Sequence, residues 1–171
     1  KRTGVSPVVF KGSDDPHDFI GRVFKLLFAL VVVVVLAYSM SPSVYQYSVP
    51  VGWLEYTWLK WAGTCLLLLS LAWTLVAQAQ MGLSWRVGID TEHKTPLVRR
   101  GIFGFSRNPI FLGMNLTLLG LFLIIPNALT LLVFVMGVVL IQIQVRLEEE
   151  FLARIHGEDY AEYRCQVRRW I

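Results

Sequence analysis

The stretch NPIFLGMNLTLLGLFLIIPNALTLLVFVMGVVLIQIQV, residues 108–145, contains no charged side chain. A helix rises about 1.5 Å per residue, so this stretch is roughly twice as long as the ~30 Å hydrocarbon core of a bilayer. Pro126 and Asn127 interrupt it at a point where a helix would end. The stretch therefore predicts two membrane helices, residues 110–125 and 128–150, joined by a tight hairpin.

Two further apolar segments, residues 20–40 and 58–79, precede that stretch, and each is long enough to span a bilayer. In the whole chain of 171 residues, 55% are hydrophobic and 16% are charged, which is too little charge for the surface of a soluble domain. The sequence therefore predicts an all-α, multi-pass integral membrane protein. Residues 1–171 are expected to form a single domain with four transmembrane helices.

Basic residues are distributed asymmetrically under this four-helix arrangement. Of the 16 Lys and Arg residues, only Lys60 falls on the side of the membrane opposite to the two ends of the chain. The others lie in or beside the tail over residues 1–19, the loop over residues 80–109 and the C-terminal segment over residues 151–171. Because Lys and Arg accumulate on the cytoplasmic side, both ends and the loop are expected in the cytoplasm. Topology explains the basic charge, and no motif indicates nucleic-acid binding.

No metal site and no disulfide are expected from the sequence. Cys65 lies inside an apolar segment and Cys165 in the C-terminal segment, so the two thiols occupy different environments. His17, His93 and His156 are isolated, and none has a neighbour at the spacing of a metal ligand.

Polar residues gather in the loop over residues 80–109, which ends with Arg107-Asn108-Pro109. The loop is rich in Gly and Pro, and its length is typical of a functional segment. Pro109 suits the first turn of the following helix, Asn108 can cap it, and the free amides there favour an anionic group such as a carboxylate. A plain capped helix with a snorkelling arginine is the structural alternative.

A second polar segment follows the last apolar stretch and begins with Glu148, Glu149 and Glu150. The negative end of a helix dipole disfavours three carboxylates, so we expect the helix to continue as an amphipathic extension as far as Gly157. A solvated run of charge is one interpretation. The other is a carboxylate pair, Glu148 and Glu149, facing a pocket at the membrane surface that holds a cationic or hydroxyl-bearing ligand.

Several short motifs follow one another in the second half of the chain: GLSWRVGID (82–90), Leu97-Val98 before Gly101-Ile-Phe103, RNPIFLG (107–113), and Glu148-Glu149-x-x-Leu152 leading to Gly157-x-x-Tyr160-x-x-Tyr163. In this order they resemble the isoprenylcysteine carboxyl methyltransferase-like family of integral membrane methyltransferases, which is related to the phospholipid methyltransferases. The resemblance covers residues 81–163. Two positions depart from it, because the family more often has His in place of Asn108 and a Tyr in place of Phe103.

The resemblance implies transfer of a methyl group from S-adenosyl-L-methionine to a lipophilic, membrane-resident acceptor at the cytoplasmic face. The catalytic residues that it implies are Arg107, Asn108 and Glu148. The cofactor-binding residues that it implies are Thr95, Pro96, Leu97, Val98, Phe103, Asn108, Pro109, Phe111, Glu148 and Glu149. The motifs leave the methyl acceptor open among a carboxylate, a thiol, an amine and a lipid headgroup, and they leave the oligomeric state open.

Two other interpretations remain. Membrane sterol reductases share an Arg-x-Pro-x-Tyr-like element and use a nicotinamide cofactor, but their chains are much longer and this one has no glycine-rich phosphate loop. A non-catalytic four-helix membrane protein that recruits a partner through its loop would not bind S-adenosylmethionine. The chain is short beside the eukaryotic prenylcysteine enzymes, which favours a small member from a prokaryotic inner membrane.

Overall fold

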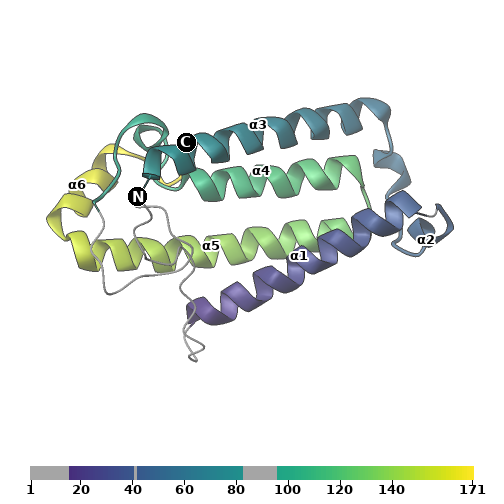
Figure 1. Ribbon diagram of the computed structural model, residues 1–171, viewed down its shortest axis with the longest axis horizontal. Helices are drawn as coiled ribbons and strands as arrows, with labels where there is room; N and C mark the ends of the chain where they lie inside the picture. The colour runs from purple at the N-terminus through teal and green to yellow at the C-terminus, as the bar shows by residue number, and fades with distance from the viewer. Residues whose placement is uncertain (1–15, 41, 83–95) are drawn as a thin grey trace, which may run out of the picture.

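The computed structural model describes residues 16–40, 42–82 and 96–171, and within these ranges the chain is helical (Figure 1). The elements, in chain order, are α1 (Pro16–Met40), α2 (Pro42–Gln46), the 3-10 helix η1 (Gly52–Leu54), α3 (Thr57–Met81), the 3-10 helix η3 (Gly101–Gly104), α4 (Pro109–Ile124), α5 (Ala128–His156) and α6 (Glu158–Gln166). The described residues form no strand beyond one isolated bridge between Pro50 and Asn127. The prediction of an all-α fold is confirmed.

Three of these helices, α1, α3 and α5, are long and apolar enough to cross a membrane. The fourth apolar helix, α4, has 16 residues, and at about 1.5 Å per residue it is shorter than the hydrocarbon core. All four predicted apolar helices are thus present, although only three have the length of a full span. The uncharged part of α5 ends at Val145, and the charged side chains of the helix all lie in residues 146–156.

The predicted hairpin between the last two apolar helices is present at Pro126-Asn127. Asn127 caps α5, since its Oδ1 accepts a hydrogen bond from the Thr130 N–H at 2.8 Å and Thr130 Oγ1 accepts one from the Asn127 N–H at 3.2 Å. At its other end, α5 continues to His156 and stops at Gly157, whose φ of +52° suits glycine. The predicted continuation of the helix as far as Gly157 is confirmed, so α5 includes the six residues after the predicted membrane helix over residues 128–150.

Small residues allow α3 and α4 to pack closely. A Cβ atom added at Gly63 would lie 2.7 Å from the carbonyl oxygen of Gly120, and one added at Gly113 would collide with Thr74. Between these points, Ser70 Oγ and Thr117 Oγ1 share a hydrogen bond of 2.9 Å. Close backbone approach of this kind is the usual way in which helices associate inside a membrane.

The two ends of the helix bundle carry different elements (Figure 1). Helix α4 contacts both α3 and α5, and α1 contacts α5 and α2. Val34, Tyr45 and Ile125 form an apolar cluster near α2. We call this the α2 end, and we call the opposite end, where α6 and η3 lie, the α6 end. Large apolar side chains on the outer helix surfaces are exposed, as hydrocarbon contact requires: Leu26, Phe28, Leu36, Leu68, Leu69, Leu71, Leu75, Leu132, Val135 and Val139.

Candidate functional site

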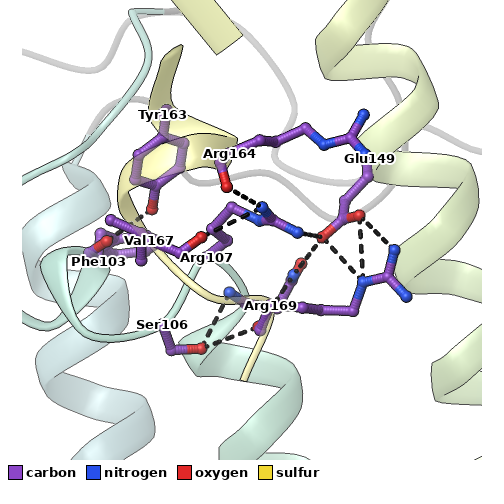
Figure 2. A network of polar contacts seen from close by, with 9 residues as sticks. Phe103, Ser106, Arg107, Glu149, Tyr163, Arg164, Val167 and Arg169 are labelled. Carbon is purple, nitrogen blue, oxygen red and sulfur yellow. Dashed lines mark hydrogen bonds and ion pairs between the residues drawn. The ribbon is translucent and has the colours of Figure 1, made fainter. Parts of the chain in front are cut away.

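Charged side chains converge at the α6 end on the carboxylate of Glu149, which α5 supplies (Figure 2). Its Oε1 accepts hydrogen bonds from Arg107 Nη2 at 3.1 Å and from Asn108 Nδ2 at 3.0 Å. Its Oε2 accepts from Arg169 Nε at 3.2 Å and Nη2 at 2.8 Å. The predicted site residues Arg107, Asn108 and Glu149 therefore meet, and the chain after α6 adds an arginine to them.

This cluster is largely shielded from solvent. The Glu149 side chain is 7% exposed and that of Arg107 is 9% exposed. Burial alone would raise the pKa of Glu149, but hydrogen bonds from Arg169 and Asn108 and the charges of the two arginines outweigh it and lower that pKa. Glu149 is therefore an ionised carboxylate whose lone pairs are already engaged by the protein.

Hydrogen bonds join the segment that follows α6 to the residues at the start of α4. The Arg107 N–H donates to the Arg168 carbonyl at 3.0 Å, and Arg107 Nη1 donates to the carbonyls of Arg164 at 3.0 Å and Val167 at 3.2 Å. Ser106 Oγ donates to the Arg169 carbonyl at 3.2 Å. Arg107 thus joins α4, α5 and the last part of the chain in one network.

Asn108 occupies the N-cap position of α4, but its side chain makes no capping hydrogen bond. The expectation that Asn108 caps this helix is wrong, because its amide donates to Glu149 and, at 3.4 Å, to the Arg169 carbonyl. Ser106 Oγ accepts the Asn108 N–H at 3.2 Å. Pro109 is in the first turn, as predicted, and its carbonyl accepts a hydrogen bond of 2.9 Å from Trp73 Nε1.

The turn that carries Phe103 is held from two sides. Gln80, in the last turn of α3, packs against Gly101, and its Oε1 accepts the Ile102 N–H at 2.9 Å. Gly101 has a φ of +64° and no room for a Cβ atom. On the other side, Tyr163 Oη donates to the Phe103 carbonyl at 2.6 Å, and burial raises the pKa of Tyr163 to about 12.

The predicted cofactor-lining segment before η3 lies against α6. Leu97 and Val98 are partly buried, and Arg99 ties them to α6. Arg99 Nη2 donates to the Asp159 carbonyl at 2.6 Å, and its Nη1 contacts Glu162 at 3.2 Å. Pro96 begins the described part of this segment, while Thr95 lies outside the described residues. Phe111, in the first turn of α4, is partly buried.

The two adjacent glutamates differ in their surroundings. Glu148 makes no hydrogen bond or ion pair with the described part of the chain, whereas Glu149 has three partners. Burial, and then the charge of Glu149, raise the pKa of Glu148 to about 7. Glu148 is thus the carboxylate with free bonding capacity. In the described ranges, no group of three His, Cys, Asp or Glu side chains is placed to hold a metal ion.

Two buried polar atoms beside this cluster, Tyr160 Oη and Arg107 Nε, have no hydrogen-bond partner among the residues that the structure describes. Tyr160 is 1% exposed, and burial raises the pKa of its hydroxyl above its ordinary range. Nearly all buried polar groups in proteins are paired with protein atoms, water or a ligand, so these two atoms have bonding capacity that the described residues do not use.

Several contributors to the site were not among the predicted site residues, and three of them show what sequence reasoning could and could not find. Tyr160 belongs to the motif Gly157-x-x-Tyr160-x-x-Tyr163, but the motif alone did not indicate what the side chain does. Gln80 could have been noted as a polar side chain in the last turn of an apolar helix. Arg169 carries no sequence signal of its own, because it is one of many basic residues that topology already explains.

A family model described as phospholipid methyltransferase matches residues 58–159, more than half of the 171-residue chain. The chain belongs to the phospholipid methyltransferase family. This match confirms the resemblance drawn from the motifs, and it makes the protein a member of a family of membrane methyltransferases. Neither curated proteins nor solved structures give a match.

Proposed function

We propose that this protein transfers a methyl group from S-adenosyl-L-methionine to a lipophilic acceptor at the cytoplasmic face of the membrane. One observation carries the proposal. At the polar end of an apolar helical bundle, Arg107 Nε and Tyr160 Oη are buried with no partner in the described part of the chain, beside the hydrogen-bonded cluster of Arg107, Asn108 and Glu149. Membership of the phospholipid methyltransferase family supports the reaction class.

The residues present fit the chemical groups of this cofactor, which has a carboxylate, an ammonium group, ribose hydroxyls and a sulfonium. Arg107 Nε and Tyr160 Oη can donate to the carboxylate. Glu148, which has free lone pairs, suits the ammonium group or a ribose hydroxyl. Apolar and ring walls would come from the remaining residues implied by the motifs: Leu97, Val98, Phe103, Pro109 and Phe111, with Pro96 and Thr95 before them.

The bound cofactor supplies an activated methyl group on its sulfonium. The work of this chain is to bind, orient and exclude water, which can supply most of the rate of an in-line displacement. Asn108 and Arg107 hold Glu149, and they thereby fix the start of α4 against α5. Glu148 lies next to Glu149 on the same helix and would face the cofactor, so we assign Arg107, Asn108 and Glu148 to the reaction.

We further propose that all four apolar helices cross the membrane and that the α6 end faces the cytoplasm. Helix α4 packs along α3 and leads through the hairpin into α5, so it runs between two helices of spanning length. The described Arg residues beyond α1 occur in segments at the α6 end, and Lys60 lies near the α2 end beside Tyr38. This asymmetry matches the rule that basic residues stay on the cytoplasmic side.

Calorimetric titration of detergent-purified protein with S-adenosylhomocysteine tests the proposal. We expect saturable binding with a dissociation constant in the range of about 1 μM to 1 mM that is usual for enzyme ligands. Glu148→Gln and Tyr160→Phe should weaken binding about tenfold each while both variants still unfold cooperatively on heating. The exposed neighbour Glu150→Gln should bind as the unmodified protein does. No binding at about 1 mM ligand would overturn the proposal.

A further inference from the structure

The segment between α1 and α3, over residues 42–56, lies at the α2 end beside the hairpin that joins α4 to α5 (Figure 1). The Val51 N–H donates a hydrogen bond to the Pro126 carbonyl at 2.8 Å. Tyr45, which is 8% exposed, belongs to the apolar cluster of this end, and its Oη lies 3.5 Å from the same carbonyl. We call this segment the α2 cap. Backbone and side-chain contacts both fix it to the hairpin.

Four polar side chains form a row across the α2 cap and the adjoining ends of α1 and α3: Glu55, Tyr45, Tyr38 and Lys60. Tyr45 Oη donates to Glu55 Oε1 at 3.1 Å. The rings of Tyr45 and Tyr38 meet edge to face, with their centroids 5.0 Å apart. Lys60 Nζ lies 3.4 Å from Tyr38 Oη and 5.8 Å from the centre of its ring. The two tyrosines thus stand between a carboxylate and an ammonium group.

Neither of these two charges is neutralised by a neighbouring side chain. Glu55 is exposed and Lys60 is partly exposed, and neither forms an ion pair with any residue that the structure describes. Lys60 also lies in the first turn of α3, where the helix dipole disfavours a cation and no acidic residue offsets it. Both charges are therefore available to a ligand that carries the opposite charges.

Large exposed aromatic side chains share this end of the bundle: Tyr47, Trp53, Tyr56, Trp58 and Trp61. Trp and Tyr concentrate at the level of the lipid headgroups, where one end of the side chain is in apolar surroundings and the other is in water. From this level α1 and α3 continue into their long apolar stretches. The medium around Glu55 and Lys60 is therefore the headgroup layer of a bilayer.

A zwitterionic headgroup fits the two free charges better than an anionic one. Its phosphate can accept a charge-assisted hydrogen bond from Lys60, and its ammonium group can donate one to Glu55. An anionic headgroup would bring its phosphate near the Glu55 carboxylate and supply no cation for it, and like charges so placed repel. Charge complementarity thus selects a phospholipid that carries an amine.

We propose that the α2 cap binds the headgroup of an aminophospholipid, such as phosphatidylethanolamine, in the leaflet opposite to the Glu149 carboxylate. This lipid is not a methyl acceptor, because it lies at the other end of the bundle from the polar cluster. Its ammonium group would hold Glu55, which Tyr45 joins to the α4–α5 hairpin. The bound lipid therefore stabilises the α2 end without reacting.

Native mass spectrometry of detergent-purified protein tests the headgroup preference. The protein is titrated separately with dioleoyl phosphatidylethanolamine and dioleoyl phosphatidylglycerol, which have the same acyl chains. We expect the ethanolamine lipid to bind about tenfold more tightly, the factor that one charge-assisted hydrogen bond supplies. Equal affinity or a preference for the glycerol lipid would overturn the inference. So would a dimer that Trp53→Ala and Trp58→Ala convert to monomer, because a second copy would then cover this face.

Cross-linking with a water-soluble carbodiimide tests the position of the lipid. The reagent joins the lipid amine to a carboxylate in contact with it, with loss of water, and peptide mass spectrometry identifies the residue. We expect the amide on Glu55, and Lys60→Gln should lower its yield about tenfold at a limiting lipid concentration. Arg154→Gln, an exposed cation at the α6 end, is the matched control and should leave the yield unchanged. Labelling of the exposed Glu158 to the same extent as Glu55, or equal yields from the two variants, would overturn the inference.

Discussion

Replacement of Glu149 by alanine is the most informative perturbation of the polar cluster. It removes the acceptor for Arg107, Asn108 and Arg169 at once, and it leaves the guanidinium of Arg107, 9% exposed, without its counter-ion. Loss of one partner from a buried ion pair costs about 3–5 kcal/mol. For a chain of this size about 1 kcal/mol corresponds to 2–4 °C, so the melting temperature should fall by roughly 6–20 °C.

Thermal unfolding in detergent, followed by tryptophan fluorescence, measures this shift. Glu150→Ala is the matched control, because Glu150 is the next residue on α5 but is exposed. Its effect should stay within about 0.5 kcal/mol, or roughly 2 °C. If Glu149→Ala melts within that margin of Glu150→Ala, Glu149 does not anchor α4, α5 and the segment after α6, and the account of the site is wrong.

Three further perturbations test other parts of the structure. Gly63→Ala places a methyl group against the α4 backbone and should lower the free energy of unfolding by about 1–3 kcal/mol in thermal melts. Gly52→Ala, in open space, should lower it little. Equal effects of the two variants would refute close packing of α3 on α4. Gln80→Leu removes the acceptor for an η3 backbone N–H and should lower stability by about 1–2 kcal/mol and weaken S-adenosylhomocysteine binding; unchanged binding would show that η3 does not shape the site. The raised pKa of Glu148, about 7, means that its stabilising protonated form is fully present below its ordinary pKa of 4.5 and is lost as the pH rises through 7. The melting temperature of Glu148→Gln should therefore equal that of the unmodified protein near pH 5 and exceed it near pH 8. A difference in melting temperature that does not change with pH would contradict the raised pKa of Glu148.

Local sequence signals predicted the helices well. An uncharged stretch interrupted by Pro126 and Asn127 defines a hairpin because Pro126 disfavours continuation of the first helix and Asn127 can cap the second. The extension of α5 past Val145 followed from the helix dipole, and its end followed from Gly157. These features depend on residues that are neighbours along the chain, so periodicity and capping rules can predict them.

The arrangement of the site depends on contacts between segments far apart in the sequence, which local rules do not reach. Asn108 was expected to cap α4, but a carboxylate supplied 41 residues later attracts its amide more strongly than the helix end does. Arg169 was indistinguishable from other basic residues until the chain after α6 folded back on α4. The motif order predicted candidate site residues, and only the fold distinguishes Glu149, which is hydrogen-bonded by the protein, from Glu148, which is not.

The central claim is that this protein methylates a lipophilic acceptor with S-adenosylmethionine. The most direct test incubates protein in nanodiscs with S-adenosylmethionine labelled with tritium on the methyl group and a bacterial lipid extract, and measures label in the organic phase. The account predicts time-dependent label in that phase that is strongly reduced in Glu148→Gln and absent in heat-treated protein. No label above the heat-treated control, from protein that binds S-adenosylhomocysteine, would contradict it.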